Sequence, residues 1–296
     1  MWDDYLFPQS VDEALEMLET HGGEARIIAG GTDLTLQRQR GRSPTTVMVD
    51  ITRVPGLENI EERDGYVHVG AAVTHAQVTV SSLIHSRAGV LAEACGSVGG
   101  PQIRNVGTLV GNVVNALPAA DGAIALFALE AEAEVVEPRG RRWLPIAELY
   151  AGVGRCTVDS SLALITQVRF RPLGRGQAGA FERLAKRKAL ILPILNTAVV
   201  VSLDGTKIGQ ARIAIGPVAP TPFVAGDAAK SLIGKKPGEA AVSQAARLAS
   251  DAAQPRYSLL RGSAEYRKSM VEVLVRRALT RALAVASGEE GGHAQS

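Results

Sequence analysis

The sequence predicts an α+β protein, and three observations lead to that prediction. Its 296 residues correspond to roughly two domains at ~150 residues each. The first half alternates short strands and helices around a glycine pair, in the order strand, loop, helix, strand. The second half has the pattern of an antiparallel meander followed by helices. The two halves are therefore expected to be domains of different construction.

The first half begins with a helix that a capping box marks. Ser10 is followed three residues later by Glu13, and apolar residues then recur at helical spacing. Residues 26–29 are typical of a buried strand, which runs directly into Gly30-Gly31-Thr32-Asp33. The elements expected next are a helix over 34–40, strands over 46–51 and 65–73, helices over 74–80, 88–98 and 121–130, and strands near 132–137 and 162–171.

The second half starts after a glycine-rich segment. Residues 172–179 contain three glycines and are the best candidate for a boundary between domains. The turn Asp204-Gly205 indicates a hairpin. The expected elements are strands near 180–186, 196–204 and 209–216 and helices near 224–233, 238–253 and 262–286, with a disordered tail over 288–296.

Charge and composition exclude several classes of protein. Lysine and arginine total 32 against 30 for aspartate and glutamate, so the net charge is only +2. With aromatic residues at 4%, this argues against a nucleic-acid partner. No apolar run approaches the roughly 20 residues that span a bilayer, and the acidic pair Asp3-Asp4 does not fit a signal peptide. We therefore expect a cytoplasmic protein with no membrane span.

The two cysteines limit the metal chemistry of this chain. Cys95 and Cys156 cannot supply the four thiolates of an iron–sulfur cluster or of a cysteine-rich zinc site. A disulfide between them is disfavoured in the cytoplasm. The five histidines fall in no tight ligand spacing. We expect no metal site in this chain, so any redox chemistry would belong to an organic cofactor.

Two glycine-rich loops are candidates for binding anions. Consecutive backbone N–H groups of Gly30-Gly31-Thr32-Asp33 could face one anion, although a lone glycine pair is more often a tight structural turn. The stretch 102–112 adds Gly107, Thr108, Gly111 and Asn112, and Asp121 follows where a new helix begins. Two such loops suggest a dinucleotide whose pyrophosphate lies between them. Neither loop matches the GxxxxGK(S/T) phosphate-binding loop of nucleoside triphosphatases or the Rossmann fingerprint.

Six strings then carry a resemblance to a known family. They are IIAGGTDL (27–34), VGAAVTHAQV (69–78), QIRNVGTLVGNVVNALPAAD (102–121), RLAKRKALILPILNTAV (183–199), AIGPVAPTPFVA (214–225) and RGSAEYRKSMVEVLVRRAL (261–279). In this order they resemble the FAD-binding medium subunit of the molybdenum hydroxylases. That family includes the flavoproteins of xanthine dehydrogenase, carbon monoxide dehydrogenase and 4-hydroxybenzoyl-CoA reductase.

The resemblance implies a fold and a set of domains. The first domain would be an FAD-binding domain of the vanillyl-alcohol-oxidase type over residues 1–174, with lobes of about 1–58 and 59–174. The second would be a small domain of three-stranded antiparallel sheet and helices over residues 175–287, followed by the tail 288–296. This order agrees with the elements expected from the sequence pattern.

The resemblance also implies which residues hold the cofactor. Ala29 to Leu34 and Gly107 to Asn112 would wrap the FAD pyrophosphate, Asp121 would hold the ribose side, and Thr74 would approach the flavin or its diphosphate. Ile165 and Lys186 would lie near the isoalloxazine. The full set is Ile28, Ala29, Gly30, Gly31, Thr32, Asp33, Leu34, Thr74, Gly107, Thr108, Gly111, Asn112, Asp121, Ile165 and Lys186, with no catalytic residue among them.

Four departures from the family pattern are visible. Val110 stands where the family usually has glycine, so its Cβ narrows the conformations of the second loop. Val69 stands where some relatives place an aromatic residue beside the flavin. With two cysteines, the chain lacks the extra cluster loop of the 4-hydroxybenzoyl-CoA reductase type. Residues 190–193 replace an acidic position, which could alter the electron-acceptor side.

The resemblance implies an electron-transfer subunit. One FAD would bind noncovalently, because no histidine or cysteine falls within the loop strings assigned to the flavin. Electrons from a molybdenum–pterin site on a large partner would pass through [2Fe-2S] clusters on a small partner to this FAD, and then to NAD or another acceptor. The assembly would be a heterotrimer or a dimer of heterotrimers. The alternatives are a self-contained FAD oxidase or dehydrogenase and a cofactor-free scaffold subunit.

Overall fold

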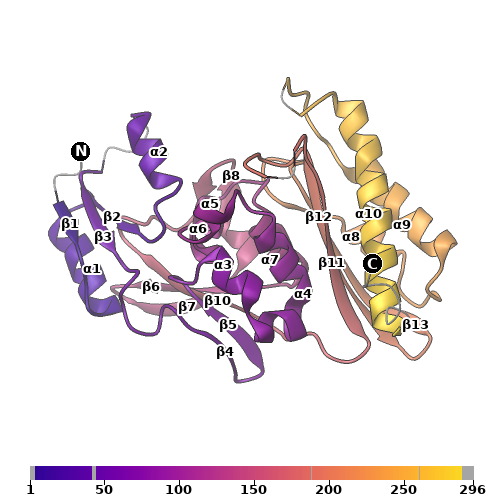
Figure 1. The fold of residues 1–296 in the computed structure, drawn as a ribbon, viewed down its shortest axis with the longest axis horizontal. Coiled ribbons are helices and arrows are strands. Elements are labelled where there is room, and N and C mark those ends of the chain that lie inside the picture. The colour runs from indigo at the N-terminus through magenta and orange to yellow at the C-terminus, as the bar shows by residue number, and fades with distance from the viewer. Residues whose placement is uncertain (1–3, 42–44, 188, 260, 289–296) are drawn as a thin grey trace.

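The structure is a computed structural model that describes residues 4–41, 45–187, 189–259 and 261–288. Helices and strands are both abundant, which confirms the predicted α+β class. The tail that the sequence predicts to be disordered lies outside the described residues, except for Gly288. Figure 1 shows one elongated molecule whose N-terminal sheet and C-terminal helices lie at opposite ends.

A small parallel sheet forms the N-terminal end. Its strands run in the order β1-β3-β2 and pair in parallel. Ser10 accepts a hydrogen bond from the Glu13 N–H at 3.0 Å, so the predicted cap does start the first helix. The elements are β1 (Asp4–Leu6), α1 (Val11–Thr20), β2 (Ala25–Ile28), α2 (Leu34–Gln39) and β3 (Val47–Asp50).

A five-stranded antiparallel sheet forms the middle of the molecule, with strand order β4-β5-β10-β6-β7. Helices α3 to α7 lie between this sheet and the C-terminal part (Figure 1). The strands are β4 (Ile60–Arg63), β5 (Tyr66–Gly70), β6 (Glu132–Glu137), β7 (Gly140–Pro145) and β10 (Leu164–Phe170), and a short hairpin holds β8 (Tyr150–Gly152) and β9 (Arg155–Cys156). The helices are α3 (His75–Val80), α4 (Ser82–Gly96), α5 (Pro101–Arg104), α6 (Leu109–Val114), α7 (Asp121–Ala128) and the 3₁₀ turn η1 (Ile146–Leu149).

The C-terminal part is an antiparallel sheet covered by helices. Three long strands form the predicted meander, and a two-residue strand, β14, adds to its edge. The strands are β11 (Gln177–Leu184), β12 (Leu195–Asp204), β13 (Lys207–Gly216) and β14 (Phe223–Val224), and the helices are α8 (Gly226–Lys230), α9 (Glu239–Ala252) and α10 (Ala264–Ser287).

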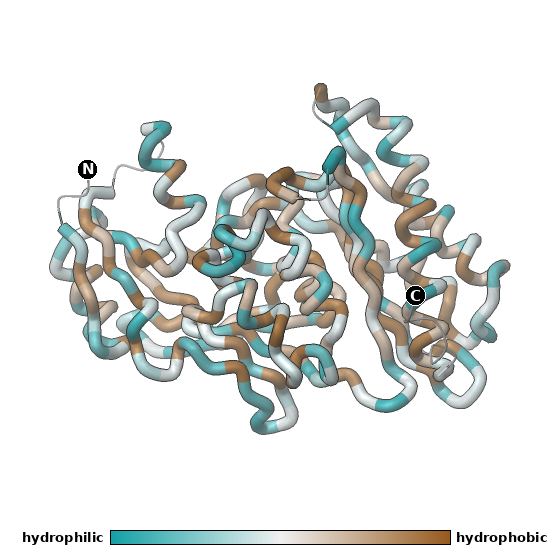
Figure 2. Tube along the Cα trace, in the orientation of Figure 1, coloured by the Kyte–Doolittle hydropathy of each residue, from teal (hydrophilic) through white to brown (hydrophobic). Residues whose placement is uncertain are grey.

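Two clusters of buried apolar residues form the interior. Side chains alternate across a strand, and on β12 this alternation sends Ala198 into the first cluster and Val199 into the second. The first cluster includes α4 and α7, and the second includes α9 and α10. Figure 2 shows brown, hydrophobic segments along the strands of this sheet and along the helices beside it. The C-terminal sheet therefore forms a wall against which the middle helices are fixed.

Two helical regions differ from the sequence-based prediction. Helix α4 begins at Ser82 rather than 88, because Ser81 caps it and a kink at Ala88 (φ −161°, ψ 55°) interrupts the apolar pattern. The stretch 102–112 was predicted as a loop, yet α5 ends and α6 begins within it. Glycine lowers helix propensity, but Thr108 accepts a hydrogen bond from the Gly111 N–H at 3.0 Å and starts α6 despite that composition.

Candidate cofactor site

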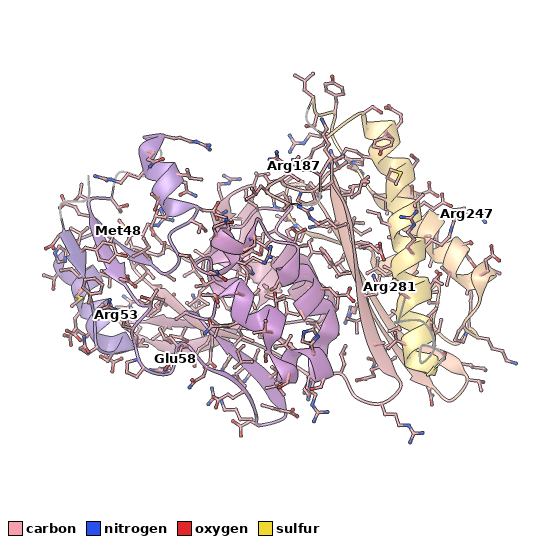
Figure 3. All side chains as sticks on the ribbon, in the orientation of Figure 1. Met48, Arg53, Glu58, Arg187, Arg247 and Arg281 are labelled. Atoms are coloured by element: carbon pink, nitrogen blue, oxygen red, sulfur yellow. The ribbon has the colours of Figure 1, made fainter. Side chains whose placement is uncertain are left out.

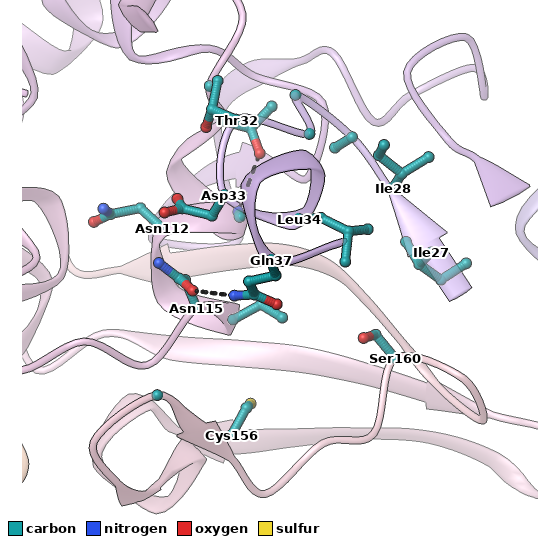
Figure 4. Close-up of a pocket in the computed structure, with 18 of the residues that line it drawn as sticks. Ile27, Ile28, Thr32, Asp33, Leu34, Gln37, Asn112, Asn115, Cys156 and Ser160 are labelled. Carbon is teal, nitrogen blue, oxygen red and sulfur yellow. Dashed lines mark hydrogen bonds between the residues drawn. The ribbon is translucent and has the colours of Figure 1, made fainter. Parts of the chain in front are cut away.

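A cavity of about 520 Å³ lies between the two glycine-rich loops. One wall is the segment from Arg26 to Leu34, and the facing wall contains Gly107, Thr108 and Gly111. Figure 4 shows side chains from both walls, including Thr32, Asp33 and Asn112, around the same space. The prediction that the two loops meet at one site is in accord with this geometry, which brings together residues 77 positions apart.

The first loop follows β2 and presents its backbone to the cavity. Gly31 has φ +63°, a region that side chains other than glycine rarely adopt. Among the described residues, none accepts a hydrogen bond from the backbone N–H groups of residues 30–33. Such a row of free donors suits an anion with several oxygens, such as a pyrophosphate.

The two loops touch through their backbones. A Cβ added at Gly30 would overlap the carbonyl oxygen of Val106 and lie 2.7 Å from the Cα of Gly107. At Gly107, an added Cβ would lie 3.4 Å from Thr32 Oγ1. The close approach leaves no room for a side chain at Gly30 and brings the two loops into contact at this point.

The second loop uses its own groups to hold its shape. Thr108 Oγ1 accepts from the Gly111 N–H, and a Cβ at Gly111 would lie only 2.8 Å from that oxygen. The Gly107 N–H donates to the Ile103 carbonyl at 2.7 Å, and the Gly107 carbonyl accepts from the His75 N–H at 2.9 Å. Hydrogen bonds within the chain therefore hold the second loop in shape, whereas the N–H groups of the first loop have no acceptor among the described residues.

Amide and carboxyl side chains add polar groups to the cavity wall. Gln37 Nε2 donates to Asn115 Oδ1 at 3.2 Å, joining α2 to the end of α6 (Figure 4). Asn112 Oδ1 accepts from the Ala123 N–H at 3.2 Å. Asp33 lines the cavity, and partial burial of its carboxyl raises the pKa of that group. A carboxylate at this place favours hydroxyl groups over phosphate as neighbours.

His75, the first residue of α3, also lines the cavity. Its side chain is buried, and Nδ1 has no hydrogen-bond partner among the described residues. Burial, assisted by the positive charge of Arg104, lowers the pKa of His75 to about 4. The imidazole is therefore neutral near pH 7 and keeps a buried ring nitrogen without a partner among the described residues.

The remaining wall comes from a distant part of the chain that the sequence did not indicate. Ser160 Oγ accepts from Arg26 Nε at 2.8 Å, and the Ser160 carbonyl accepts from the Ile27 N–H at 2.9 Å. These bonds hold the 156–160 segment against β2. No sign of this contact was visible in the sequence, because the segment is short and has no periodic pattern of apolar residues. The residues it adds to the cavity are Ala151, Gly154, Arg155, Cys156, Thr157, Val158, Asp159 and Ser160.

Val110 and Ile165 line a smaller apolar cavity of about 70 Å³ under the second loop. Val110 lies within helix α6 and is buried, so its backbone adopts a conformation open to any residue. The prediction that the Val110 Cβ restricts this loop is therefore wrong, because a helical backbone accepts a Cβ at this position. Ile165 is buried on β10, and the small cavity that it lines shares Ala29 and Gly111 with the main one.

Four predicted site residues do not line the main cavity: Ile165, which lines only the smaller one, and Thr74, Asp121 and Lys186. Thr74 caps α3 by accepting from the Gln77 N–H at 3.2 Å, and it pairs with Thr108 in a β-bridge. Asp121 is buried in an ion pair with Arg183 at 3.2 Å, and burial raises the pKa of its carboxyl. Lys186 is exposed on the connection between β11 and β12.

Comparison with known proteins identifies the family. Residues 2–172 match the family described as FAD binding domain in molybdopterin dehydrogenase. The chain belongs to this family. Residues 180–282 match a second family, the CO dehydrogenase flavoprotein C-terminal domain. The chain is thus an oxidoreductase flavoprotein subunit, as the sequence resemblance implied.

Several relatives cover almost the whole chain. The 6-hydroxypseudooxynicotine dehydrogenase complex subunit alpha of Paenarthrobacter nicotinovorans is 34% identical over 95% of this chain and 94% of its own length. The carbon monoxide dehydrogenase medium chain of Hydrogenophaga pseudoflava is 31% identical over 95% and 97%. A solved carbon monoxide dehydrogenase structure from the same organism superposes with a TM-score of 0.90 at 30% identity, covering 96% of this chain and 98% of that one.

The cavity fits FAD, the cofactor of this family. The free N–H groups of residues 30–33 suit the pyrophosphate, and the neutral His75 adds no charge to the site. His75 and Cys156 both line the cavity outside the glycine loops, so noncovalent binding stays a prediction. Within the described residues, no cluster of histidine, cysteine, aspartate or glutamate could hold a metal ion, and no helix is long and apolar enough to cross a membrane.

Proposed function

We propose that this chain is the electron-transfer subunit of a molybdenum hydroxylase complex. Electrons would leave a substrate at a molybdenum–pterin site on a large partner and reach this chain through [2Fe-2S] clusters of a small partner. They would then pass to NAD or another external acceptor. We propose a cytoplasmic complex, assembled as a heterotrimer or a dimer of heterotrimers.

One observation carries the proposal. Residues 30–33 line the cavity, and their backbone N–H groups have no acceptor in the described chain. Unpaired donors are costly unless a ligand or water satisfies them. The close approach of Gly30 to the second loop holds this row in place. A pyrophosphate with several oxygens would satisfy the donors together.

The residues of this chain would bind and orient the cofactor. When bound, FAD supplies the reversible uptake of electrons, and the protein supplies its position and surroundings. Residues 28–34 would hold the pyrophosphate, Thr108 and Gly111 would brace the facing loop, and Asp33 would accept from ribose hydroxyls. Asp121, Thr74 and Lys186 remain proposed cofactor residues, although their side chains lie outside the main cavity.

The relatives support the proposed partners. One is named as a subunit of a complex and another as a medium chain, which implies further chains in those proteins. We propose the same division of labour here, with domains over 1–174 and 175–287. A self-contained oxidase would have to reduce its flavin with substrate and no partner. A scaffold subunit would hold no flavin.

The test is to purify the chain alone and with its co-expressed partners, and to record the visible spectrum and the mass of the released cofactor. FAD in both preparations, reduced by substrate only when the partners are present, is the expected result. Absence of flavin from both would contradict the proposal and leave the scaffold. Reduction by substrate in the lone chain would identify an independent enzyme.

A further inference from the structure

Three segments beside the cavity form one continuous surface, which we call the rim surface. Leu190 donates its N–H to the carbonyl of Gly99 at 3.0 Å, and Arg261 Nε donates to the carbonyl of Pro193 at 3.2 Å. In Figure 1, α5, the adjoining ends of β11 and β12, and the start of α10 lie along one edge of the molecule. The rim surface consists of residues 98–106, 185–187 with 189–193, and 256–259 with 261–263.

Large apolar side chains on the rim surface are exposed. The exposed fraction is 58% for Leu190, 54% for Leu192, 68% for Tyr257 and 85% for Leu259, and Val106 is also exposed. Single exposed apolar residues are ordinary, but several gathered on one surface mark an interaction site. The hydrogen bonds of the preceding paragraph place these residues on neighbouring segments.

Leu190 shows that this surface is held in a particular shape. Its φ is +55°, a conformation that is unfavourable for leucine. Its N–H is held by Gly99, and its carbonyl accepts from Arg187. Strained backbone of this kind persists only where surrounding contacts impose it, and such positions gather at functional sites. Figure 3 labels Arg187 at this edge, at the adjoining ends of β11 and β12.

Charge is also segregated on the rim surface. The whole chain is almost neutral, at +2. All charged side chains on the rim surface are nevertheless cationic, and it carries no aspartate or glutamate. Arginine and tyrosine are enriched at protein interfaces, whereas acidic residues are depleted there. An apolar surface with arginines around it fits a partner whose facing surface is apolar at its centre and acidic at its edge. The cations are Arg104, Lys186, Arg187, Arg256 and Arg261.

Ile103 connects the rim surface to the cavity. It lines the cavity, yet 36% of its surface is exposed beside Val106. A protein seated here would lie next to the cofactor. Because electron exchange between protein-bound centres slows steeply with distance, a partner that delivers electrons must dock close to the cofactor it serves.

We propose that the rim surface docks the [2Fe-2S] partner subunit, through an acidic face with an apolar centre. This inference rests on the proposed function, which supplies the identity of the electron-delivering partner. The surface therefore fits a protein better than a small acceptor such as NAD, which could not cover five exposed apolar side chains on three segments.

The test compares variants in the co-expressed complex, with an affinity tag on this chain. Leu192→Asp combined with Leu259→Asp places carboxylates against the apolar centre of the partner's face, and its control combines Val80→Asp with Val285→Asp at exposed sites elsewhere. Arg256→Glu reverses one rim charge, and Arg247→Glu is its control on α9. The measurements are the FAD content of the isolated chain and its affinity for the small partner.

The rim double variant is expected to keep its FAD and lose about 30-fold or more in affinity for the small partner. Arg256→Glu should slow association at low salt and match the wild type at high salt. Both controls should behave as wild type. Unchanged affinity in the rim variants would overturn the docking proposal. So would a complex that assembles but no longer reduces NAD, or a rim variant that only stops the chain from self-associating.

The two proposals fail separately in this experiment. A wild-type chain without flavin contradicts the proposed function, whatever its partners do. A flavin-containing chain whose rim variants still bind the small partner contradicts only the docking proposal. The FAD content and the partner affinity are independent readouts.

Discussion

The two glycine-rich loops of the cofactor site differ in what they do with their backbone groups. The first, at residues 30–33, keeps its N–H groups free and has no side-chain cap at Asp33. The second satisfies its Gly107 and Gly111 N–H groups internally and is capped by Thr108. The sequence predicted one role for both. Under the proposed function, the first loop would bind the cofactor, while the second would hold the first in place.

Gly30→Ala should break this arrangement with the largest effect. The new Cβ would overlap the backbone of Val106 and Gly107, which cannot move aside as a flexible side chain could. Overpacking typically costs about 1–3 kcal/mol, so FAD affinity should fall by up to about 100-fold. Isothermal titration with FAD would measure it.

The control for this variant is Gly226→Ala, where an added Cβ meets no atom within 4 Å. Its FAD affinity should equal that of the wild type. If Gly30→Ala also binds FAD normally, the contact between the loops does not set the width of the site.

Val110→Gly tests the supporting role of the second loop. Val110 is buried within α6, so its removal should cost about 2–3 kcal/mol from lost burial and lower helix propensity. Because the side chain faces the small apolar cavity, FAD affinity in the folded protein should change little. Urea denaturation and FAD titration separate the two quantities.

An exposed helical position supplies the comparison for Val110. Val285→Gly on α10 should cost no more than about 1 kcal/mol. A loss of FAD affinity in Val110→Gly, beyond the loss of folded protein, would assign the second loop a direct role in binding.

His75 should make stability depend on pH. Its pKa lies near 4 in the folded chain, against an ordinary value of 6.5. Between those values the unfolded chain binds a proton that the folded chain excludes, so stability falls as the pH drops from 6.5 toward 4. The slope from this group is at most about 1.4 kcal/mol per pH unit.

Urea denaturation of the apoprotein at several pH values would measure this slope. His75→Phe should reduce it, while His68, whose pKa burial also lowers, keeps its own contribution. An identical slope in the variant and the wild type would rule out a neutral, buried His75.

Thr108→Val should lower stability less than Val110→Gly does. It removes the oxygen that accepts from the Gly111 N–H, at a cost of about 1 kcal/mol in stability. Thr108→Ser should retain the cap and most of the stability. In the first loop, Asp33→Ala removes no cap and should change stability by less than about 0.5 kcal/mol. Equal losses at Thr108 and Asp33 in thermal melts would erase the distinction between the loops.

The sequence predicted those parts of the fold that depend on local patterns. The strand over 132–137 and the helix opened by Thr74 are confirmed, because alternation and capping act between near neighbours. The glycine loops were recognised from their composition and from the family resemblance. The chain is confirmed as a member of that family.

Long-range contacts were out of reach of that reasoning. The wall at 156–160 meets β2 through Ser160 and Arg26, which are 134 positions apart. Asp121 stands at the start of a helix and was expected to meet a ribose, yet Arg183 of β11 reaches it in an ion pair. Neither partner shares a local pattern with the residue it contacts. Only the packing of distant strands brings them together.

Strand β12 has a consequence for how this protein can be divided. Its alternating side chains belong to two interiors, so removing the C-terminal half would leave the first interior with one side open to water. Calorimetry should therefore show one cooperative transition, and two separate ones would contradict this. The N-terminal half is therefore not a unit that could be moved unchanged into another protein. Produced alone, it would need another surface to cover the side that β12 now closes.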